Sequence, residues 1–358
     1  MSYSQRKITI GQREYWISTD PDYGKHLGER FEPNTVALLE CLSSPDSRIL
    51  DIGANIGITG ILLALLSPGG SVTAIEPVPA AYKLLSKNVG NSGHKNIRTC
   101  NFALGKTEGE VVMQGNPSNL SGSFVSDIHS IDDGLHFKEV VRQHALDDVF
   151  GSLGLERLDL IKIDVEGYEL DVLEGAKSVL ARYQPIVTLE MNYVALNLWR
   201  NMSLPEFRAR LLDIFPFVYA VNEGGHIDFR DEKRSHDVLF NHLTKWAFMD
   251  IVAGFDVDAL TNKLERLEYI RYKNEIEYAQ SRETNESVNR VAEMQAIIDH
   301  LEEDLNCVKE DLNCAREGGA AHERESALAR ERIHAIEGSH SWMLTAPLRG
   351  LMRSFRKR

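Results

Sequence analysis

The chain has 358 residues, and its 53 acidic side chains outnumber its 40 lysine and arginine side chains, which gives a formal net charge of −13. The length accommodates one catalytic domain and an additional region. The acidic balance excludes nucleic acid as the main partner, because that partner requires a basic face. Four cysteines without a C-x-x-C pair, an N-terminus without an apolar core and the lack of a run of about 20 apolar residues predict a protein made and kept in the reducing cytosol.

Up to residue 253, short apolar runs alternate with helix-like segments, as in a doubly wound parallel sheet. Helix-like segments separate the first five predicted strands, whereas the last two have no long helix between them and are expected to form a hairpin at one edge. The predicted strands are Arg48–Asp51, Ser71–Glu76, Ile97–Phe102, Leu158–Asp164, Ile186–Met191, Phe217–Val221 and Asp237–Asn241. The expected fold class is therefore α/β, a Rossmann-like seven-stranded sheet in a domain of residues 1–253.

The first predicted strand ends in Asp51, with Gly53 and Gly57 two and six positions later, and the second ends in Glu76. In an open α/β sheet, such glycines let the backbone approach a nucleoside, and the acid at the end of the second strand hydrogen-bonds ribose hydroxyls. A dinucleotide site would require G-x-G-x-x-G. The spacing therefore favours an S-adenosylmethionine (SAM) pocket over NAD, and over a glycine turn without a ligand.

Carboxylates follow the fourth and fifth predicted strands, whose carboxyl ends meet at the ligand-binding edge of such a sheet. They could ligate a divalent ion such as Mg²⁺, orient an acceptor or act as a general base. Lys162, inside the fourth strand, is interpreted as structural. The candidate catalytic bases are Asp164, His226 and His236, and the candidate metal ligands are Asp164, Glu190 and Asn192.

From about Asp256, glycine and proline nearly vanish and charge rises, which predicts a helical coiled-coil region over residues 256–336. Leu260, Leu264 and Leu267 suggest an early start of its seam. A solitary charged helix packed on the catalytic domain is the alternative, and a trimer is an alternative to the favoured dimer. The regular seam consists of Val291, Met294, Ile298, Leu301, Leu305, Val308 and Leu312, at alternating steps of three and four.

Residues 338–358 contain no acidic side chain and are predicted to form a basic amphipathic tail. The tail could bind an anionic membrane surface or a partner protein. Pro347 favours a helix start. The apolar stripe after it is Leu348, Leu351, Met352 and Phe355, at i, i+3, i+4 and i+7.

From about Phe31 to His242 the sequence resembles the FkbM-type SAM-dependent methyltransferases. Three blocks carry the resemblance: D-I-G-A-N-I-G at 51–57 with E-P at 76–77, N-F-A-L-G at 101–105, and I-K-I-D-V-E-G-Y-E at 161–169 with L-E-G-A at 173–176. The resemblance implies a class I SAM methyltransferase fold. It also implies cofactor-binding roles for Glu32, Asp51, Gly53, Asn55, Gly57, Glu76, Phe102, Ala103 and Asp164.

Members of this family typically methylate hydroxyls of sugars or natural products. The segment at 339–349 is also similar to the S-x-S-W-x-L-T-x-P-L-R tail of bacterial surface-polysaccharide enzymes. Together they imply an O-methyltransferase acting on a sugar hydroxyl of a cell-surface polysaccharide or its lipid-linked precursor. The expected partners are that glycan, further copies of the chain, and an anionic membrane surface or polysaccharide-assembly proteins at the inner face of the cytoplasmic membrane.

Two other functions are weighed against this one. The first is a methyltransferase of a small natural product or lipid, which the polysaccharide-type tail disfavours. The second is a non-catalytic coiled-coil scaffold with a degenerate SAM domain, which the intact Asp51, Gly53, Glu76 and Asp164 disfavour.

Overall fold

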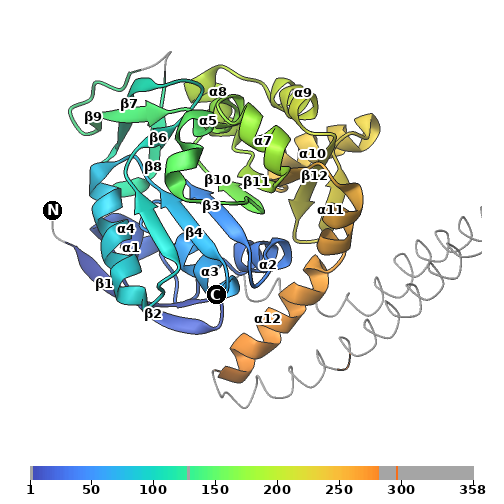
Figure 1. Ribbon diagram of the computed structural model, residues 1–358, viewed down its shortest axis with the longest axis horizontal. Helices are drawn as coiled ribbons and strands as arrows, with labels where there is room; N and C mark the ends of the chain where they lie inside the picture. The colour runs from blue at the N-terminus through green and yellow to red at the C-terminus, as the bar shows by residue number, and fades with distance from the viewer. Residues whose placement is uncertain (1–2, 127–129, 282–295, 297–358) are drawn as a thin grey trace, which may run out of the picture. The chain divides into compact units, whose positions relative to one another are not determined.

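A mixed sheet of eight strands organises the part of the chain that the structure, a computed structural model, describes: residues 3–126, 130–281 and 296 (Figure 1). Its strand order is β13-β12-β14-β11-β10-β3-β4-β5. The run from β11 to β5 is parallel, and β14, β12 and β13 are antiparallel to their neighbours. The strands are β3 (Arg48–Ile52), β4 (Ser71–Ile75), β5 (Ile97–Cys100), β10 (Leu160–Ile163), β11 (Ile186–Glu190), β12 (Phe217–Asn222), β13 (Gly225–Asp228) and β14 (Asp250–Gly254).

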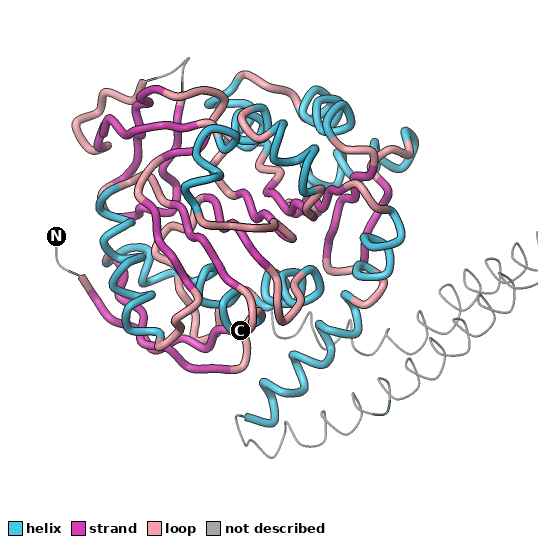
Figure 2. Tube along the Cα trace, viewed as in Figure 1, coloured by secondary structure: helices cyan, strands magenta, loops and turns pink. Residues whose placement is uncertain are grey.

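Helices flank this sheet (Figure 2). Among them, α3 packs on β4, and α11 packs against α2 and β14. The helices are α1 (Pro21–His26), α2 (Pro33–Leu42), α3 (Ile58–Leu66), α4 (Pro79–Ser92), α5 (Leu146–Val149), α6 (Glu169–Glu174), α7 (Lys177–Tyr183), α8 (Tyr193–Arg200), α9 (Leu204–Ile214), α10 (Glu232–Lys245), α11 (Val257–Leu264) and α12 (Leu267–Ser281), with a 3₁₀ turn η1 (Phe150–Leu153).

Six of the seven predicted strands are present, but the seventh is wrong. Asp237–Asn241 lies inside helix α10, where the Asp231 side chain caps the first turn and Phe240 is exposed. The buried residues of α10 are Ser235, Val238 and His242, at i, i+3 and i+7, which is one face of a helix. The edge hairpin is instead β12–β13. The sheet has eight strands rather than seven because two unpredicted strands, β13 at the edge and β14 between β11 and β12, join the six predicted ones.

A second sheet occupies the segment between β5 and β10, where a helix-like segment was expected. It has the order β6-β9-β7-β8 and is built of β6 (Ala103–Leu104), β7 (Gly109–Asn116), β8 (Asn119–Val125) and β9 (Phe137–His144). Adjacent valines at Val140 and Val141 alternate between exposed and buried, which is the pattern of a strand with one solvated face. A separate hairpin pairs β1 (Ser4–Ile10) with β2 (Arg13–Thr19).

The chain divides into two units, Met1–Asn274 and Glu275–Arg358. The first continues through α11 and into α12, beyond the predicted domain end at residue 253. Leu260, Leu264 and Leu267 are at most 2% exposed within it, so these leucines belong to its core and do not start a seam. The regular heptad seam from Val291 to Leu312 and the basic tail lie outside the described residues, apart from residue 296.

None of the helices that the structure describes is both long and apolar enough to span a membrane.

Candidate active site

The glycine loop after β3 is shaped by close packing against β10. Gly53 has a φ of +78°, and a Cβ placed there would lie 1.8 Å from the Asp164 carbonyl oxygen. Gly57 has a φ of +94° and precedes α3, and its Cβ would lie 2.7 Å from Leu85 Cδ1. Only glycine fits either position without displacing its neighbours. This packing explains why glycine is needed at both positions, and the predicted approach of the backbone to a nucleoside stays a prediction.

Glu76 holds this loop from the end of β4. Its side chain is buried, with Oε2 accepting a hydrogen bond from the Asn55 backbone N–H at 2.9 Å and Oε1 accepting one from Val78 N–H at 2.8 Å. Burial raises the pKa of Glu76 to about 7, although both backbone hydrogen bonds oppose the rise. In this structure Glu76 therefore positions the loop, and it does not itself line the cavity described below.

A second buried glutamate, Glu169, holds the loop after β10 in the same way. Its Oε1 accepts hydrogen bonds from the backbone N–H groups of Val165 and Gly167 at 3.2 and 3.1 Å. Glu166, between them, has a φ of +52°, a conformation that few non-glycine residues adopt. Burial raises the pKa of Glu169 to about 7. Sequence reasoning assigned no role to Glu169, although it belongs to a quoted block.

Lys162 links the two loops electrostatically. Its Nζ donates a hydrogen bond to Asp164 Oδ2 at 3.0 Å and lies 3.8 Å from Asp51 Oδ1, which is an ion pair without a hydrogen bond. Asp51 is fully buried, and Thr59 donates to its other oxygen at 2.8 Å. Burial alone would lower the pKa of Lys162, but Asp164 and Asp51 outweigh it and raise that pKa. Lys162 lines the cavity, so its interpretation as purely structural is incomplete.

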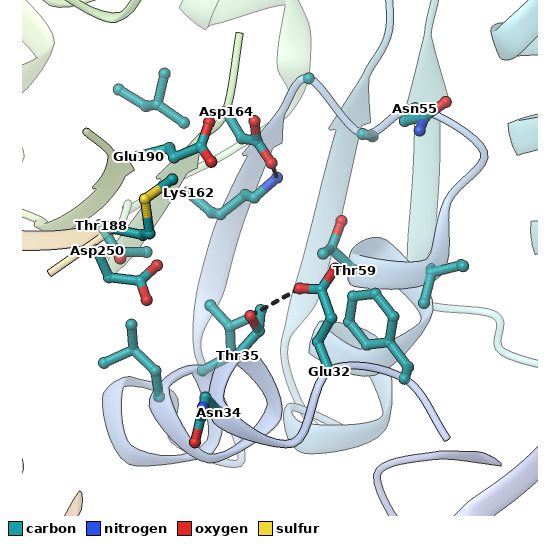
Figure 3. Close-up of a pocket in the computed structure, with 18 of the residues that line it drawn as sticks. Glu32, Asn34, Thr35, Asn55, Thr59, Lys162, Asp164, Thr188, Glu190 and Asp250 are labelled. Carbon is teal, nitrogen blue, oxygen red and sulfur yellow. Dashed lines mark hydrogen bonds and ion pairs between the residues drawn. The ribbon is translucent and has the colours of Figure 1, made fainter. Parts of the chain in front are cut away.

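A cavity of about 440 Å³ opens where the carboxyl ends of β3, β10 and β11 meet (Figure 3). This volume lies within the range of ligand pockets, roughly 300–1,000 Å³. Five predicted site residues line it: Glu32, Gly53, Asn55, Asp164 and Glu190. Residues that sequence reasoning missed also line it, including Tyr23, Thr35, Lys162, Thr188, Met249 and Asp250.

Figure 3 shows Asn55 on one side of the cavity, Glu190 and Asp250 on the other, and Lys162 with Asp164 between them. Glu190 and Asp250 are directly opposite one another in the β11–β14 ladder. Burial, then Asp164, raises the pKa of Glu190 well above its ordinary value. Burial raises the pKa of Asp250 to about 6, and Glu32 and Asp164 add to the rise.

The remaining predicted residues lie away from the cavity lining. His226 is on the edge strand β13, where its ring packs edge-on against Tyr219, and burial lowers its pKa. His236 is exposed on α10, with Nδ1 bonded to the Glu232 carbonyl oxygen. The wrong seventh strand had placed both histidines at the acceptor edge, and the structure brings neither to it.

Phe102 and Ala103, for which the resemblance implied cofactor-binding roles, also do not line the cavity. Phe102 packs edge-on against His144, and Ala103 is buried in β6. Asp51 and Gly57 do not line the cavity either. Asp51 accepts a hydrogen bond from Thr59 and faces Lys162, and Gly57 packs against Leu85. The cavity is therefore lined by the glycine loop and by the carboxylates that follow β10 and end β11, but not by Phe102 or Ala103.

The proposed metal ligands do not form a matching donor set. Asn192 Oδ1 accepts hydrogen bonds from the Val194 and Ala195 backbone N–H groups and so caps α8, and Asp164 Oδ2 is bonded to Lys162. Within residues 3–126 and 130–281, no group of three or more His, Cys, Asp or Glu side chains is arranged to hold a metal ion. The residues present therefore do not fit the expected magnesium site.

The side of the cavity formed by the glycine loop fits a nucleoside-type cofactor. Asn55, in the left-handed region at φ +46°, lines the cavity. Its Oδ1 is buried without a hydrogen-bond partner among the described residues. A buried acceptor left unpaired is costly, so a ligand that donates a hydrogen bond there would remove the cost.

Three features define the class of the fold: the glycine loop after β3, the acid Glu76 after β4, and the carboxylates at the carboxyl ends of β10 and β11. The fold is α/β and similar to class I SAM methyltransferases. Residues 51–221 match the family profile of the Methyltransferase FkbM domain. This part of the chain is thus similar to the FkbM methyltransferase domain, the family that the sequence resembles.

Several curated proteins that the chain resembles are named as methyltransferases. The chain is 30% identical over 156 residues to methyltransferase sdnD of Sordaria araneosa, covering 36% of this chain and 59% of that protein. It is 30% identical over 164 residues to the 2-O-methyltransferase NoeI of Sinorhizobium fredii, covering 42% and 66%. It is 24% identical over 151 residues to the hexuronic acid methyltransferase AglP of Haloferax volcanii, covering 42% and 59%. The chain spans less than two thirds of the length of each of these relatives.

Solved structures include a methyltransferase FkbM from Methylobacillus flagellatus, at 18% identity and a TM-score of 0.35, covering 49% of this chain and 40% of that one. An O-methyltransferase from Bacillus cereus in complex with SAH has 16% identity and a TM-score of 0.34, covering 63% and 80%. Both TM-scores are below 0.5.

Proposed function

We propose that the chain is a SAM-dependent O-methyltransferase that acts on a sugar hydroxyl of a bacterial cell-surface polysaccharide or its lipid-linked precursor. The observation that supports it most directly is that the glycine loop, Asp164 and Glu190 line the same cavity. The FkbM domain match over residues 51–221 supports methyl transfer.

We propose that one side of the cavity binds the cofactor and the other binds the acceptor. When bound, SAM supplies a methyl group on a positively charged sulfur and leaves as a neutral thioether. The Gly53–Asn55 side is the proposed cofactor side, and Asn55 Oδ1 would accept one of its hydrogen bonds. The side with Glu190 and Asp250 is the proposed acceptor side.

Asp164, between these sides, is the proposed base. It takes the proton of the acceptor hydroxyl as the new oxygen–carbon bond forms and the sulfur–carbon bond breaks. Lys162, in β10, fixes the orientation of Asp164 through the hydrogen bond to Oδ2. The orientation of the base relative to the acceptor hydroxyl matters because positioning supplies much of the rate in such displacements.

The names of two relatives support an oxygen acceptor on a sugar: a 2-O-methyltransferase and a hexuronic acid methyltransferase. The tail at residues 339–349, similar to those of polysaccharide enzymes, supports the surface glycan. We further propose that the seam at residues 291–312 oligomerises the chain and that residues 338–358 attach it to the inner face of the membrane.

The test is incubation of the full chain with methyl-labelled SAM and a panel of nucleotide sugars, lipid-linked glycans, lipids and small phenols. Label in a glycan fraction supports the proposal, and Asp164→Asn should abolish it while leaving the domain folded. Label only in lipids or phenols would favour the natural-product alternative. No label and no SAM binding would leave the scaffold alternative.

A further inference from the structure

The two carboxyl groups on the acceptor side form a pair built into the sheet. Glu190 ends β11, Asp250 begins β14, and the ladder places them directly opposite each other. Opposite residues in an antiparallel pair have Cβ atoms about 4.5–5.5 Å apart. Both side chains line the cavity, and Figure 3 shows them on its same side.

Neither carboxyl group is used by the fold itself. No hydrogen bond or ion pair joins the side chain of Glu190 or Asp250 to any residue that the structure describes. Partly buried carboxyl groups without partners are costly. Such a cost is common where a site has been built for a ligand rather than for stability.

The charge of the cavity wall restricts what that ligand can be. The charged residues in the lining are Glu32, Lys162, Asp164, Glu190 and Asp250. Lys162, the single cation of this set, is already paired with Asp164 at 3.0 Å and faces Asp51 at 3.8 Å. The nearby Arg271 does not line the cavity, and its guanidinium donates to the carbonyl oxygens of Asn222 and Glu223.

From these observations we propose that Glu190 and Asp250 bind the acceptor and select an uncharged polyhydroxylated sugar over an acidic one. This inference rests on the proposed function, since it assigns the substrate class of the same cavity. A hydroxyl group donates one hydrogen bond and accepts others. An uncharged sugar can therefore satisfy both carboxyl groups through neighbouring hydroxyls.

The protonation of the pair is suited to this task. Burial and the neighbouring Asp164 raise the pKa of Glu190 well above its ordinary value, whereas the pKa of Asp250 is about 6. At pH 7.5, above its pKa, Asp250 mainly accepts hydrogen bonds. An acidic sugar would bring a further negative charge to a wall with no uncommitted cation among its described lining residues, and like charges in such a site repel.

The experiment uses the full chain saturated with SAH and measures sugar binding by saturation-transfer NMR titration. The probes are methyl α-D-glucopyranoside and methyl α-D-glucopyranosiduronate, which differ by a carboxylate at C6. The variants are Asp250→Asn and Glu190→Gln. Asp258→Asn, at an exposed position of α11, is the matched control. SAH affinity is recorded for every sample.

The expected result is that the wild type and Asp258→Asn bind the glucoside at least about tenfold more tightly than the glucosiduronate. Asp250→Asn should reduce this preference to about threefold or less, and Glu190→Gln should weaken the glucoside. Equal or tighter binding of the glucosiduronate by the wild type would overturn the proposal. So would an unchanged preference in Asp250→Asn, or no binding of either sugar. Retained SAH binding in those cases would show that the failure concerns the acceptor site and not the proposed methyltransferase function.

Discussion

Replacing Asp250 by asparagine should stabilise the folded chain, and the gain should grow with pH. Burial, with Glu32 and Asp164, raises the pKa of Asp250 from 3.8 to about 6. The folded state therefore holds this proton more tightly than the unfolded chain does. An acid with a raised pKa begins to cost stability above its unfolded pKa, and the cost is complete above the folded one.

The magnitude follows from the same values. A tenfold change in proton affinity is worth about 1.4 kcal/mol, so the full cost above pH 7 is about 3 kcal/mol. Asp250 keeps some exposure to the cavity, where water screens its charge, so we expect a gain of about 1–2 kcal/mol at pH 8. At pH 4 most of the cost is absent, and the gain should fall to roughly 0.5 kcal/mol or less.

The assay is urea unfolding of the wild type, Asp250→Asn and the control Asp258→Asn at pH 4, 6 and 8. The free energy of unfolding of Asp250→Asn should exceed that of the wild type increasingly from pH 4 to pH 8. Asp258→Asn should show no such trend. A gain independent of pH, or a loss at pH 8, would refute the reasoning, because either would mean that Asp250 is not a strained ionised group in the folded cavity.

Three further changes test other parts of the account. Lys162→Met leaves the fully buried Asp51 without its cation and should cost about 3–5 kcal/mol in urea unfolding; a loss under about 1 kcal/mol would contradict the role of this ion pair. Glu76→Ala removes the hydrogen bond to Asn55 N–H in the glycine loop and the one to Val78 N–H. It should weaken SAM binding more than about tenfold, whereas unchanged calorimetric affinity would show that Glu76 does not shape the cofactor side. Deleting residues 282–358 should give a chain that is monomeric in light scattering and still binds SAM. Deleting only residues 338–358 should keep the oligomer but abolish pelleting with anionic liposomes. Equal pelleting of the full and tail-less chains would favour a protein partner for the tail.

Four of the five parallel strands, β3, β4, β10 and β11, were predictable because each is a short, mainly apolar run that ends at an acid or is followed by a glycine turn or an acid. The last antiparallel strand was not. Asp250–Gly254 is as apolar as the others, but it follows α10, whose residues were mistaken for a strand. Assigning that strand incorrectly also moved His226 and His236 to the acceptor edge, which shows how one topological error passes into the site.

The site was predictable where the backbone alone decides the geometry, as for Gly53, Asn55 and Asp164. It was not predictable where distant segments meet. Asp250 reaches the cavity only because β14 pairs with β11, and nothing in the local sequence indicates this pairing. Lys162 was undervalued because a lysine inside an apolar strand gives no sign of the buried Asp51 on the neighbouring strand.

The central claim, that the glycine-loop side of the cavity holds SAM, is tested most directly by calorimetric titration of SAM into the wild type and Asn55→Gly. Glycine tolerates the left-handed backbone at this position, so the substitution removes the side chain with little strain. The account predicts that the wild type binds SAM, that Asp258→Asn binds it equally, and that Asn55→Gly binds it about tenfold more weakly. No binding by the wild type, or equal affinity in Asn55→Gly, would contradict the account.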